Sequence, residues 1–178
     1  PKQARTEQAG GDQSQHAPPG RGYGRDPKLE AGGVHVTAPA LIDTAHRLVG
    51  NGKGLLAMDE SNPTCNKRFA ALGIPQTVEA RRAWRELIVT TPALADSISG
   101  AILYDETIYQ SCSNGTPFVK VLSDAGIVVG IKVDTGAKPL AGYPGESVTE
   151  GLDGLRERLA NYSAIGARFA KWRAVIAI

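Results

Sequence analysis

Apolar and polar positions change their spacing along the chain, and the change predicts strands and helices in turn. Short apolar runs without alternation, typical of strands covered on both faces, occur at Lys53–Met58, Ile98–Leu103, Ile127–Val133 and Arg168–Ile178. Between these runs, apolar side chains recur every three or four positions, which is the spacing of a helix with one buried face. Strands that alternate with helices in this way favour right-handed βα units and a parallel sheet.

The first two long helical patterns have residues suited to begin and end them. Thr37 followed by Pro39 predicts the start of a helix, and Gly50 its end. Thr77 can cap a second helix over Val78–Val89. The apolar stripe expected to face the core of this second helix consists of Ala80, Ala83, Trp84, Leu87 and Ile88.

Two further helices are expected in the second half of the chain. A short one is predicted over Pro117–Ser123. Ser147 and Glu150 have the spacing of a capping box, which predicts the start of a longer helix that Gly166 is well placed to end.

The four predicted strands are compatible with two α/β folds. Four βα units at this spacing correspond to half of a (β/α)₈ barrel, which typically has ~250 residues. An open doubly wound sheet is the alternative. Its glycine-rich phosphate loop follows a strand and opens a helix, whereas the glycines of Gly50–Gly54 precede a strand. We therefore favour the TIM (β/α)₈ barrel, with about the first four βα units present.

Residues 1–33 have a different composition from the rest of the chain. They include seven glycines and four prolines, and Leu29 is their only residue among Ile, Leu, Val and Phe. Such a segment buries too little apolar surface to fold, so we expect a disordered or unrelated tail before one domain at 34–178. It has no apolar core of a signal peptide and no recognisable transit peptide. The chain begins at Pro1 and closes on the apolar run Ala174–Ile178, so we expect both ends to be cut.

Composition narrows the class of protein further. The 178 residues carry 20 Lys and Arg against 18 Asp and Glu, a net charge of +2 with no basic footprint for nucleic acid or an anionic membrane. No apolar stretch approaches the ~20 residues that cross a bilayer, so we expect a soluble protein. Cys65 and Cys112 fit no disulfide or zinc pattern, and His35 and His46 have no second ligand at metal spacing. We expect a reducing compartment and no metal or other cofactor.

Ionisable side chains follow each predicted strand, where the loops of a barrel form the active site. Asp59 follows the first strand, whereas Lys132 and Lys171 lie within otherwise apolar strands. An ion pair with Asp59 is the simplest explanation for either lysine alone. Two lysines and one aspartate from three strands favour a shared site that holds an oxyanion or moves a proton. We therefore expect all three to converge at one end of the sheet.

More cationic and hydroxyl side chains are expected near the same end, namely Ser61, Thr64, Lys67, Arg68, Arg81 and Arg82. A phosphorylated substrate would explain this set, because guanidinium groups bind phosphate with two hydrogen bonds. For Arg82, Arg85 and Lys120 we favour a solvated helix surface.

Several segments together resemble class I fructose-bisphosphate aldolase, in the order and at the spacing of that family, from about Leu41 to Ile178. They are Gly54–Asn62, Thr64–Arg68, Gly100–Gln110, Gly130–Asp134, Pro139–Gly142, Gly151–Leu155 and Gly166–Arg173. Met58 and Asn62–Cys65 look more similar to the plant and algal plastid branch than to the animal one. That branch implies the plastid stroma or the cytoplasm as the location.

The resemblance implies a (β/α)₈ barrel, commonly a homotetramer, that reversibly cleaves fructose 1,6-bisphosphate to dihydroxyacetone phosphate and glyceraldehyde 3-phosphate. Asp59 would contact the substrate's hydroxyls and assist carbinolamine chemistry. Lys132 would hold Asp59 and the substrate, and Lys171 would polarise the hydroxyl at the bond that breaks. Arg173 would support that site. The rim that binds phosphate would consist of Ser61, Thr64, Arg68 and Arg81.

The same resemblance places the Schiff-base lysine on the sixth strand and an acid/base glutamate on the fifth, beyond the four strands predicted here. We therefore expect no cleavage by these 178 residues alone. Two alternatives remain open. One is a truncated product that binds sugar phosphate or a barrel partner without catalysis, and the other is a different barrel lyase that acts on phosphosugars.

Overall fold

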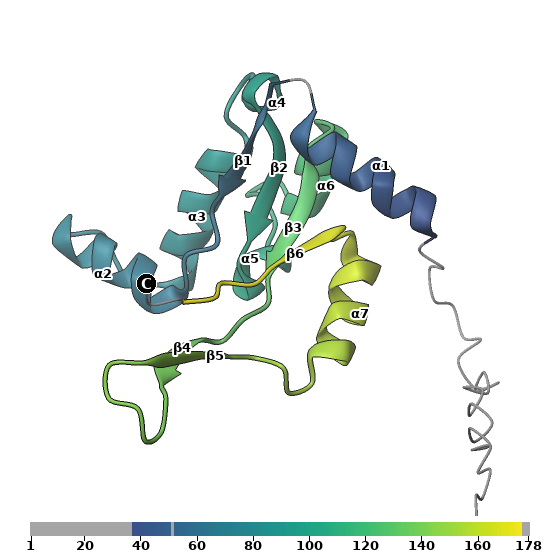
Figure 1. Cartoon of the computed structure of the whole chain (residues 1–178). Helices are drawn as coiled ribbons and strands as arrows, with labels where there is room; N and C mark the ends of the chain where they lie inside the picture. Colours follow the sequence, from purple (N-terminus) through teal and green to yellow (C-terminus); the bar gives the residue numbers. More distant parts are fainter. Residues whose placement is uncertain (1–36, 51, 176–178) are drawn as a thin grey trace, which may run out of the picture. The chain divides into compact units, whose positions relative to one another are not determined.

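The computed structural model describes residues 37–50 and 52–175 (Figure 1). These residues form a four-stranded sheet, a separate two-stranded hairpin and the helices around them. The tail predicted for residues 1–33 lies outside the described residues. None of the described helices is both long and apolar enough to cross a bilayer.

The main sheet consists of parallel strands arranged in the order of the chain. Its order is β1 (Gly54–Ala57), β2 (Ile98–Leu103), β3 (Val128–Lys132) and β6 (Phe169–Lys171), and each strand is parallel to its neighbours. Successive parallel strands joined by helices are the units of a (β/α)₈ barrel, as the sequence predicts. The carboxyl ends of all four strands therefore lie at one end of the sheet.

Helices connect these strands and cover the sheet (Figure 1). In chain order they are α1 (Ala38–Val49), α2 (Asn62–Ala71), α3 (Val78–Val89), α4 (Leu94–Ser97), α5 (Asp105–Ile108), α6 (Phe118–Asp124) and α7 (Leu155–Ile165). Thr77 caps α3 as predicted, because its hydroxyl accepts a hydrogen bond from the Ala80 backbone N–H at 3.2 Å. Gly166, with φ of 127°, ends α7 as predicted.

The core lies between β2, β3 and α6. Leu103, Ile131, Phe118 and Leu122 are each no more than 1% exposed, and burying a side chain of this size contributes about 1.5–3 kcal/mol. In β2 every residue after Ile98 is buried, which explains why this strand has no alternation of apolar and polar positions. The core thus fixes the strands whose ends carry the ionisable groups.

The capping box predicted at Ser147 is wrong. Residues Ser147–Glu150 form β5, which pairs antiparallel with β4 (Gly136–Pro139) in a hairpin. Gly151 and Gly154 follow with φ of 129° and 62°, a backbone that other residues rarely adopt, so no continuous helix runs from Ser147 into α7. Figure 1 shows the hairpin beyond the carboxyl ends of the sheet.

Two further differences from the sequence prediction are the length of the fourth strand and the presence of helix α2. The fourth strand is short, because only Phe169–Lys171 pairs with β3 and the described residues 172–175 have no regular structure. Helix α2 was not predicted, although Ser61 at its N-cap and Pro63 in its first turn are typical of a helix start. Both differences lie next to the cavity described below.

Helix α1 has large apolar side chains that the described residues leave uncovered. Leu41 and Val49 are 58% and 79% exposed. The helix is attached to the sheet near its C-terminal end, where the Ser99 hydroxyl donates to the Leu48 carbonyl at 2.7 Å. Gly100 allows this approach, because a Cβ there would lie 2.6 Å from the Leu48 side chain.

Candidate active site

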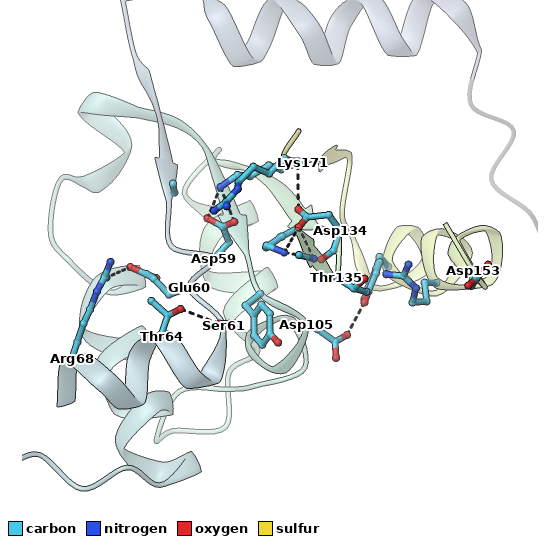
Figure 2. Close-up of a pocket in the computed structure, with 17 residues that line it drawn as sticks. Asp59, Glu60, Ser61, Thr64, Arg68, Asp105, Asp134, Thr135, Asp153 and Lys171 are labelled. Atoms are coloured by element: carbon cyan, nitrogen blue, oxygen red, sulfur yellow. Dashed lines mark hydrogen bonds and ion pairs between the residues drawn. The ribbon is translucent and has the colours of Figure 1, made fainter. Parts of the chain in front are cut away.

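A cavity of about 790 Å³ lies at the carboxyl ends of the parallel strands (Figure 2). Its lining includes residues that directly follow or end each strand, namely Asp59, Tyr104, Lys132, Asp134, Lys171 and Arg173. This is the placement that a barrel gives to its functional groups. The structure therefore brings Asp59, Lys132 and Lys171 to one cavity.

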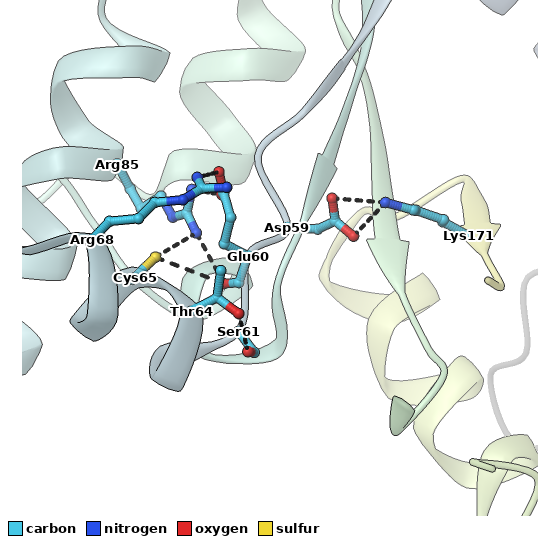
Figure 3. Close-up of polar contacts among 8 residues, drawn as sticks. All are labelled: Asp59, Glu60, Ser61, Thr64, Cys65, Arg68, Arg85 and Lys171. Carbon is cyan, nitrogen blue, oxygen red and sulfur yellow. Dashed lines mark hydrogen bonds and ion pairs between the residues drawn. The ribbon is translucent and has the colours of Figure 1, made fainter. Parts of the chain in front are cut away.

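Asp59 and Lys171 form an ion pair across the cavity (Figure 3). The Lys171 ammonium donates to both carboxylate oxygens of Asp59, at 3.0 and 2.7 Å. Asp59 is only 8% exposed, whereas the Lys171 side chain keeps about a third of its surface accessible. The pair joins the first and fourth strands of the sheet, and one of its members remains open to a ligand.

Lys132 has a different partner from the one that the resemblance implies. Its ammonium donates to Oδ1 and to the backbone carbonyl of Asp134, each at 2.7 Å. Among the described residues its ion pair is with Asp134 and not with Asp59. Lys132 and Lys171 are register partners in β3 and β6, so their side chains leave the sheet on the same face. The two lysines of the cavity thus belong to two separate ion pairs.

Asp134 is the most enclosed carboxylate of the cavity, with a side chain 2% exposed. It also accepts hydrogen bonds from the backbone N–H groups of Gly136 at 3.1 Å and Arg173 at 3.2 Å. Burial acts to raise the pKa of Asp134, but the bonds from Lys132 and from the two N–H groups outweigh it. The pKa of Asp134 is therefore below its ordinary value.

Three of the four residues expected at a phosphate rim line the cavity: Ser61, Thr64 and Arg68. The hydroxyls of Ser61 and Thr64 lie 3.0 Å apart. Arg68 extends from α2 with 62% of its side chain exposed and contacts Glu60 at 2.6 Å. These groups can donate hydrogen bonds to an anion that enters the cavity from solvent.

Arg81, the fourth residue expected at the rim, is not there. It is 7% exposed and lies outside the lining of the cavity. Its guanidinium binds the Glu106 carboxylate in a two-bond contact of 2.7 and 2.8 Å and donates to the Asn66 amide oxygen at 2.9 Å. The hydrogen bond from Arg81 lowers the pKa of Glu106. Arg81 therefore joins α3 to α5, which contains Glu106, and to α2, which contains Asn66.

Arg85 is also buried, which contradicts its interpretation as part of a solvated helix surface. Its side chain is 2% exposed and donates to the carboxylate of Glu60 at 2.6 Å and to the Glu60 carbonyl at 3.0 Å. The buried side of α3 is formed by Arg81, Arg85 and Val89, whereas Trp84 of the predicted apolar stripe is 41% exposed. The reason is the position of two carboxylates in the segments after β1 and β2. Glu60 pairs with Arg85 and Glu106 pairs with Arg81 on this side of α3.

Of the other two residues interpreted as solvated, Lys120 is exposed, whereas the Arg82 side chain is only 31% exposed and also donates to the Ser111 carbonyl. Arg82 pairs with Glu86 and Lys120 pairs with Asp124, each four residues further along its helix. Both members of the Lys120–Asp124 pair are 62% exposed. Such pairs contribute little to stability.

Glu60 is shared by two arginines, with Arg68 on one oxygen and Arg85 on the other (Figure 3). Burial acts to raise the pKa of Glu60, but hydrogen bonds and the charge of Arg85 outweigh it, so the pKa is lowered. Next to this pair, burial raises the pKa of Cys65, and the Arg85 charge offsets this only in part. The buried Cys65 thiol is thus a poor nucleophile.

Two residues of α7, Arg158 and Tyr162, line the cavity although the sequence alone does not select them. The Tyr162 hydroxyl donates to Asp105 at 2.7 Å, and burial together with this bond raises the pKa of Tyr162 to about 12. Arg158 donates to the backbone carbonyls of Val133, at 2.9 Å, and of Gly151. Arg158 and Tyr162 belong to a helix, where the rule that functional groups follow strands cannot find them. The described residues include no cluster of His, Cys, Asp and Glu that could hold a metal.

Comparison with known proteins decides which family this arrangement belongs to. The family model of glycolytic class I fructose-bisphosphate aldolases matches residues 40–178. The chain belongs to the class I fructose-bisphosphate aldolase family. The resemblance found in its sequence is thereby confirmed at the level of the family.

Relatives of the aldolase family occur in bacteria and in plastids. A probable class 1 fructose-bisphosphate aldolase of Xanthomonas campestris is 62% identical over 138 residues, which are 78% of this chain and 41% of that protein. The chloroplastic fructose-bisphosphate aldolase 3 of Arabidopsis thaliana is 54% identical over 78% of this chain and 35% of that protein. The bacterial relative has a higher identity than the chloroplastic one. The comparison therefore supports the family but not the plastid branch in particular.

A solved aldolase structure has the same fold. The fructose-bisphosphate aldolase of Plasmodium falciparum, crystallised in complex with TRAP and a small-molecule inhibitor, matches with a TM-score of 0.73 and 47% identity. The match covers 75% of this chain and 38% of that one. This chain thus spans about two fifths of the length of the relatives described here.

Proposed function

We propose that the cavity at the carboxyl ends of β1, β2, β3 and β6 is part of the active site of a fructose 1,6-bisphosphate aldolase. The observation that carries the proposal is the Asp59–Lys171 pair, which lies beside Lys132 in the same cavity. A carboxylate and two ammonium groups can move a proton and stabilise developing negative charge in one place. Membership of the aldolase family supports the choice of substrate.

The proposed reaction begins when a lysine amine adds to the ketone carbonyl of fructose 1,6-bisphosphate. The carbinolamine loses water to give an iminium ion, which accepts the electron pair of the carbon–carbon bond as that bond breaks. One hydroxyl loses its proton and becomes the aldehyde of glyceraldehyde 3-phosphate. The enamine left on the lysine is then protonated and hydrolysed to dihydroxyacetone phosphate. The family resemblance places that nucleophilic lysine outside residues 1–178.

In this reaction Asp59 and Lys171 act on the substrate's hydroxyl groups. Asp59 contacts hydroxyls and assists formation and dehydration of the carbinolamine. Lys171 polarises the hydroxyl at the bond that breaks, and the exposed third of its side chain supports access to substrate. Lys132 binds the substrate from the neighbouring strand, and Arg173 supports the same region.

One of the two phosphates of the substrate is proposed to bind where the cavity meets solvent. Ser61 and Thr64 offer hydroxyl donors, and Arg68 offers a guanidinium that is largely exposed. A phosphate dianion binds such a set through charge-assisted hydrogen bonds. Arg81 is not part of this rim, since its donors are used by Glu106 and Asn66.

The second candidate function is binding of a sugar phosphate, or of a barrel partner, without catalysis. It is favoured by one observation, that the hydroxyl and guanidinium groups of Ser61, Thr64 and Arg68 already line the cavity and need no further residue to bind a phosphate. The homotetramer, the plastid branch and a location in the plastid stroma or cytoplasm stay predictions. They rest on the resemblance of the sequence, for the branch on Met58 and Asn62–Cys65.

A hybrid protein tests the proposed function. In this hybrid, residues 40–178 of the chain replace the matching residues of the Xanthomonas relative, so that the whole family length is present. Cleavage of fructose 1,6-bisphosphate is followed by reducing the triose phosphates with NADH and a coupling dehydrogenase. We expect cleavage by the hybrid, and a fall of about 10²–10⁴-fold in kcat for Lys171→Met, which removes one acid/base group.

Lys120→Met is the matched control, because Lys120 lies in an exposed ion pair away from the cavity. It should leave kcat within about twofold of the parent hybrid. A folded hybrid that binds fructose 1,6-bisphosphate without cleaving it would overturn the proposal in favour of binding alone. Equal losses for Lys171→Met and Lys120→Met would contradict the role given to Lys171.

A further inference from the structure

Both oxygens of the Asp134 carboxylate accept hydrogen bonds, from residues of β3 and β4 and from the segment that follows β6. Oδ1 accepts from the Lys132 ammonium and from the Gly136 N–H, whereas Oδ2 accepts from the Arg173 N–H. The side chain is 2% exposed, and each oxygen has a donor. The carboxylate is therefore held in one orientation by the chain itself.

The contact with Arg173 continues the pairing of β3 and β6 beyond their last backbone bond. Lys132 is the register partner of Lys171, and the Val133 N–H donates to the Lys171 carbonyl at 3.1 Å. Two residues further on, Asp134 and Arg173 stand at the same offset, but a side-chain oxygen takes the place of a backbone carbonyl. Arg173, which follows the strand, is thus fixed through Asp134.

The charges of the cavity also depend on Asp134. Lys132 and Lys171 are neighbours on one face of the sheet, and like charges at this spacing repel each other. Each has its own carboxylate, Asp134 for Lys132 and Asp59 for Lys171. Without the Asp134 carboxylate, Lys132 would lose its ion-pair partner and could compete with Lys171 for Asp59.

We propose that Asp134 is a positioning residue, which holds Lys132 and the Arg173 backbone in place and thereby reserves Asp59 for Lys171. The inference rests on the proposed function for its effect on catalysis. Its structural part, the assignment of one carboxylate to each lysine, concerns this chain alone and can be tested without any cleavage assay.

Selective labelling of lysines tests the structural part. The 178-residue chain and its Asp134→Asn variant are treated with a trace of isotopic acetic anhydride, and the label at each lysine is measured by peptide mass spectrometry. Asparagine keeps the size of the side chain and an oxygen acceptor, but it removes the charge. Circular dichroism checks that the variant is folded, and the hybrid protein provides a second background for both measurements.

We expect labelling of Lys132 to rise by about fivefold or more in Asp134→Asn, since a charge-assisted hydrogen bond is lost. Labelling of Lys171 should rise by a smaller factor, because Lys132 now competes for Asp59. Lys120 should not change. The matched control is Asp124→Asn, which should raise labelling of Lys120 only. Unchanged labelling of Lys132, or an equal rise at Lys120 that marks general loosening, would overturn the inference.

A double-mutant cycle in the hybrid tests the catalytic part. Misplacing a group by about 1 Å can cost about 10²-fold, so Asp134→Asn should lower kcat/KM by about 10–100-fold. The same substitution should have little further effect after Lys132→Met, because the group that it positions is already gone. An undiminished loss in the Lys132→Met background would contradict positioning through Lys132.

Stability provides the readout that separates the two parts. Asp134→Asn should lower the urea midpoint in both lysine backgrounds, since the Arg173 contact is independent of Lys132. A purely structural role would make kcat/KM follow the midpoint in both. If the parent hybrid shows no cleavage, the proposed function fails, and the labelling result still decides whether Asp134 assigns the carboxylates.

Discussion

Lys132 and Lys171 are register partners on adjacent parallel strands, and each ammonium group contacts a different aspartate. The two contacts are not equivalent. Asp134 lies two residues after Lys132, just beyond the end of β3, whereas Asp59 follows β1 and reaches Lys171 from the opposite edge of the sheet. The first pair is local, and the second requires the fold. Only the second joins β1 to β6 across the cavity.

Arg85→Met should destabilise the chain far more than Arg82→Met, although both arginines belong to α3. Removing Arg85 leaves the Glu60 carboxylate with Arg68 alone, and breaking a buried pair costs up to about 3–5 kcal/mol. Arg82 forms an i, i+4 pair with Glu86 and remains partly exposed, and such pairs contribute little to stability. Urea unfolding of the two variants measures the difference. Equal midpoints would contradict the structural role of Arg85.

Arg81 and Arg85 of the same helix show how far sequence alone can predict burial. The bounds of α3 follow from Thr77 and the helical spacing, and the structure has them as predicted. Its buried face does not follow, because periodicity assumes that apolar side chains point inward. Here Glu60 and Glu106 lie in the segments that follow β1 and β2. Glu60 pairs with Arg85 and Glu106 pairs with Arg81, so both arginines are buried. That reversal depends on contacts between elements distant in sequence.

The candidate site was predictable in part for a related reason. Asp59, Lys132 and Lys171 were found because parallel strands bring their carboxyl ends together, whatever the details of packing. Which carboxylate each lysine contacts was not predictable. It depends on the turn after β3, where Gly136 and Arg173 hold Asp134 toward Lys132.

Stability should fall in acid. The pKa values of Glu60, Glu106 and Asp134 are all lower in the folded chain than their ordinary values of 4.5, 4.5 and 3.8. The folded state therefore binds fewer protons than the unfolded state below about pH 5. The stability from these groups is fully present above that pH and is lost as the pH falls through the folded pKa values.

The urea midpoint of unfolding, measured between about pH 7 and pH 3, tests this expectation. It should be nearly constant down to about pH 5 and then decrease. Arg81→Met should make the decrease shallower, because Glu106 loses the partner that lowers its pKa. A midpoint that stays constant to about pH 3 would show that these carboxylates have no net effect on folding.

Gly151→Ala should disturb the loop that carries Asp134. Gly151 has φ of 129°, and a Cβ there would lie 2.9 Å from the Thr135 nitrogen and 3.1 Å from the Asp134 Cα. A strained backbone of this kind costs about 1–3 kcal/mol before the clash is counted. Gly154→Ala is the matched control, since its φ is 62° and a Cβ meets nothing within 4 Å. Thermal unfolding should show a clearly larger loss for Gly151→Ala, and similar losses would mean that the close approach is unimportant.

Asp59, Lys132 and Lys171 are proposed to act on a substrate that another lysine holds. Borohydride reduction of the hybrid protein in the presence of fructose 1,6-bisphosphate, followed by peptide mapping, tests this proposal most directly, because the reduced imine stays attached to the lysine that formed it. We expect one sugar-phosphate adduct, outside the segment taken from this chain, with Lys132 and Lys171 unmodified. An adduct on Lys132 or Lys171, or cleavage without any adduct, would contradict it.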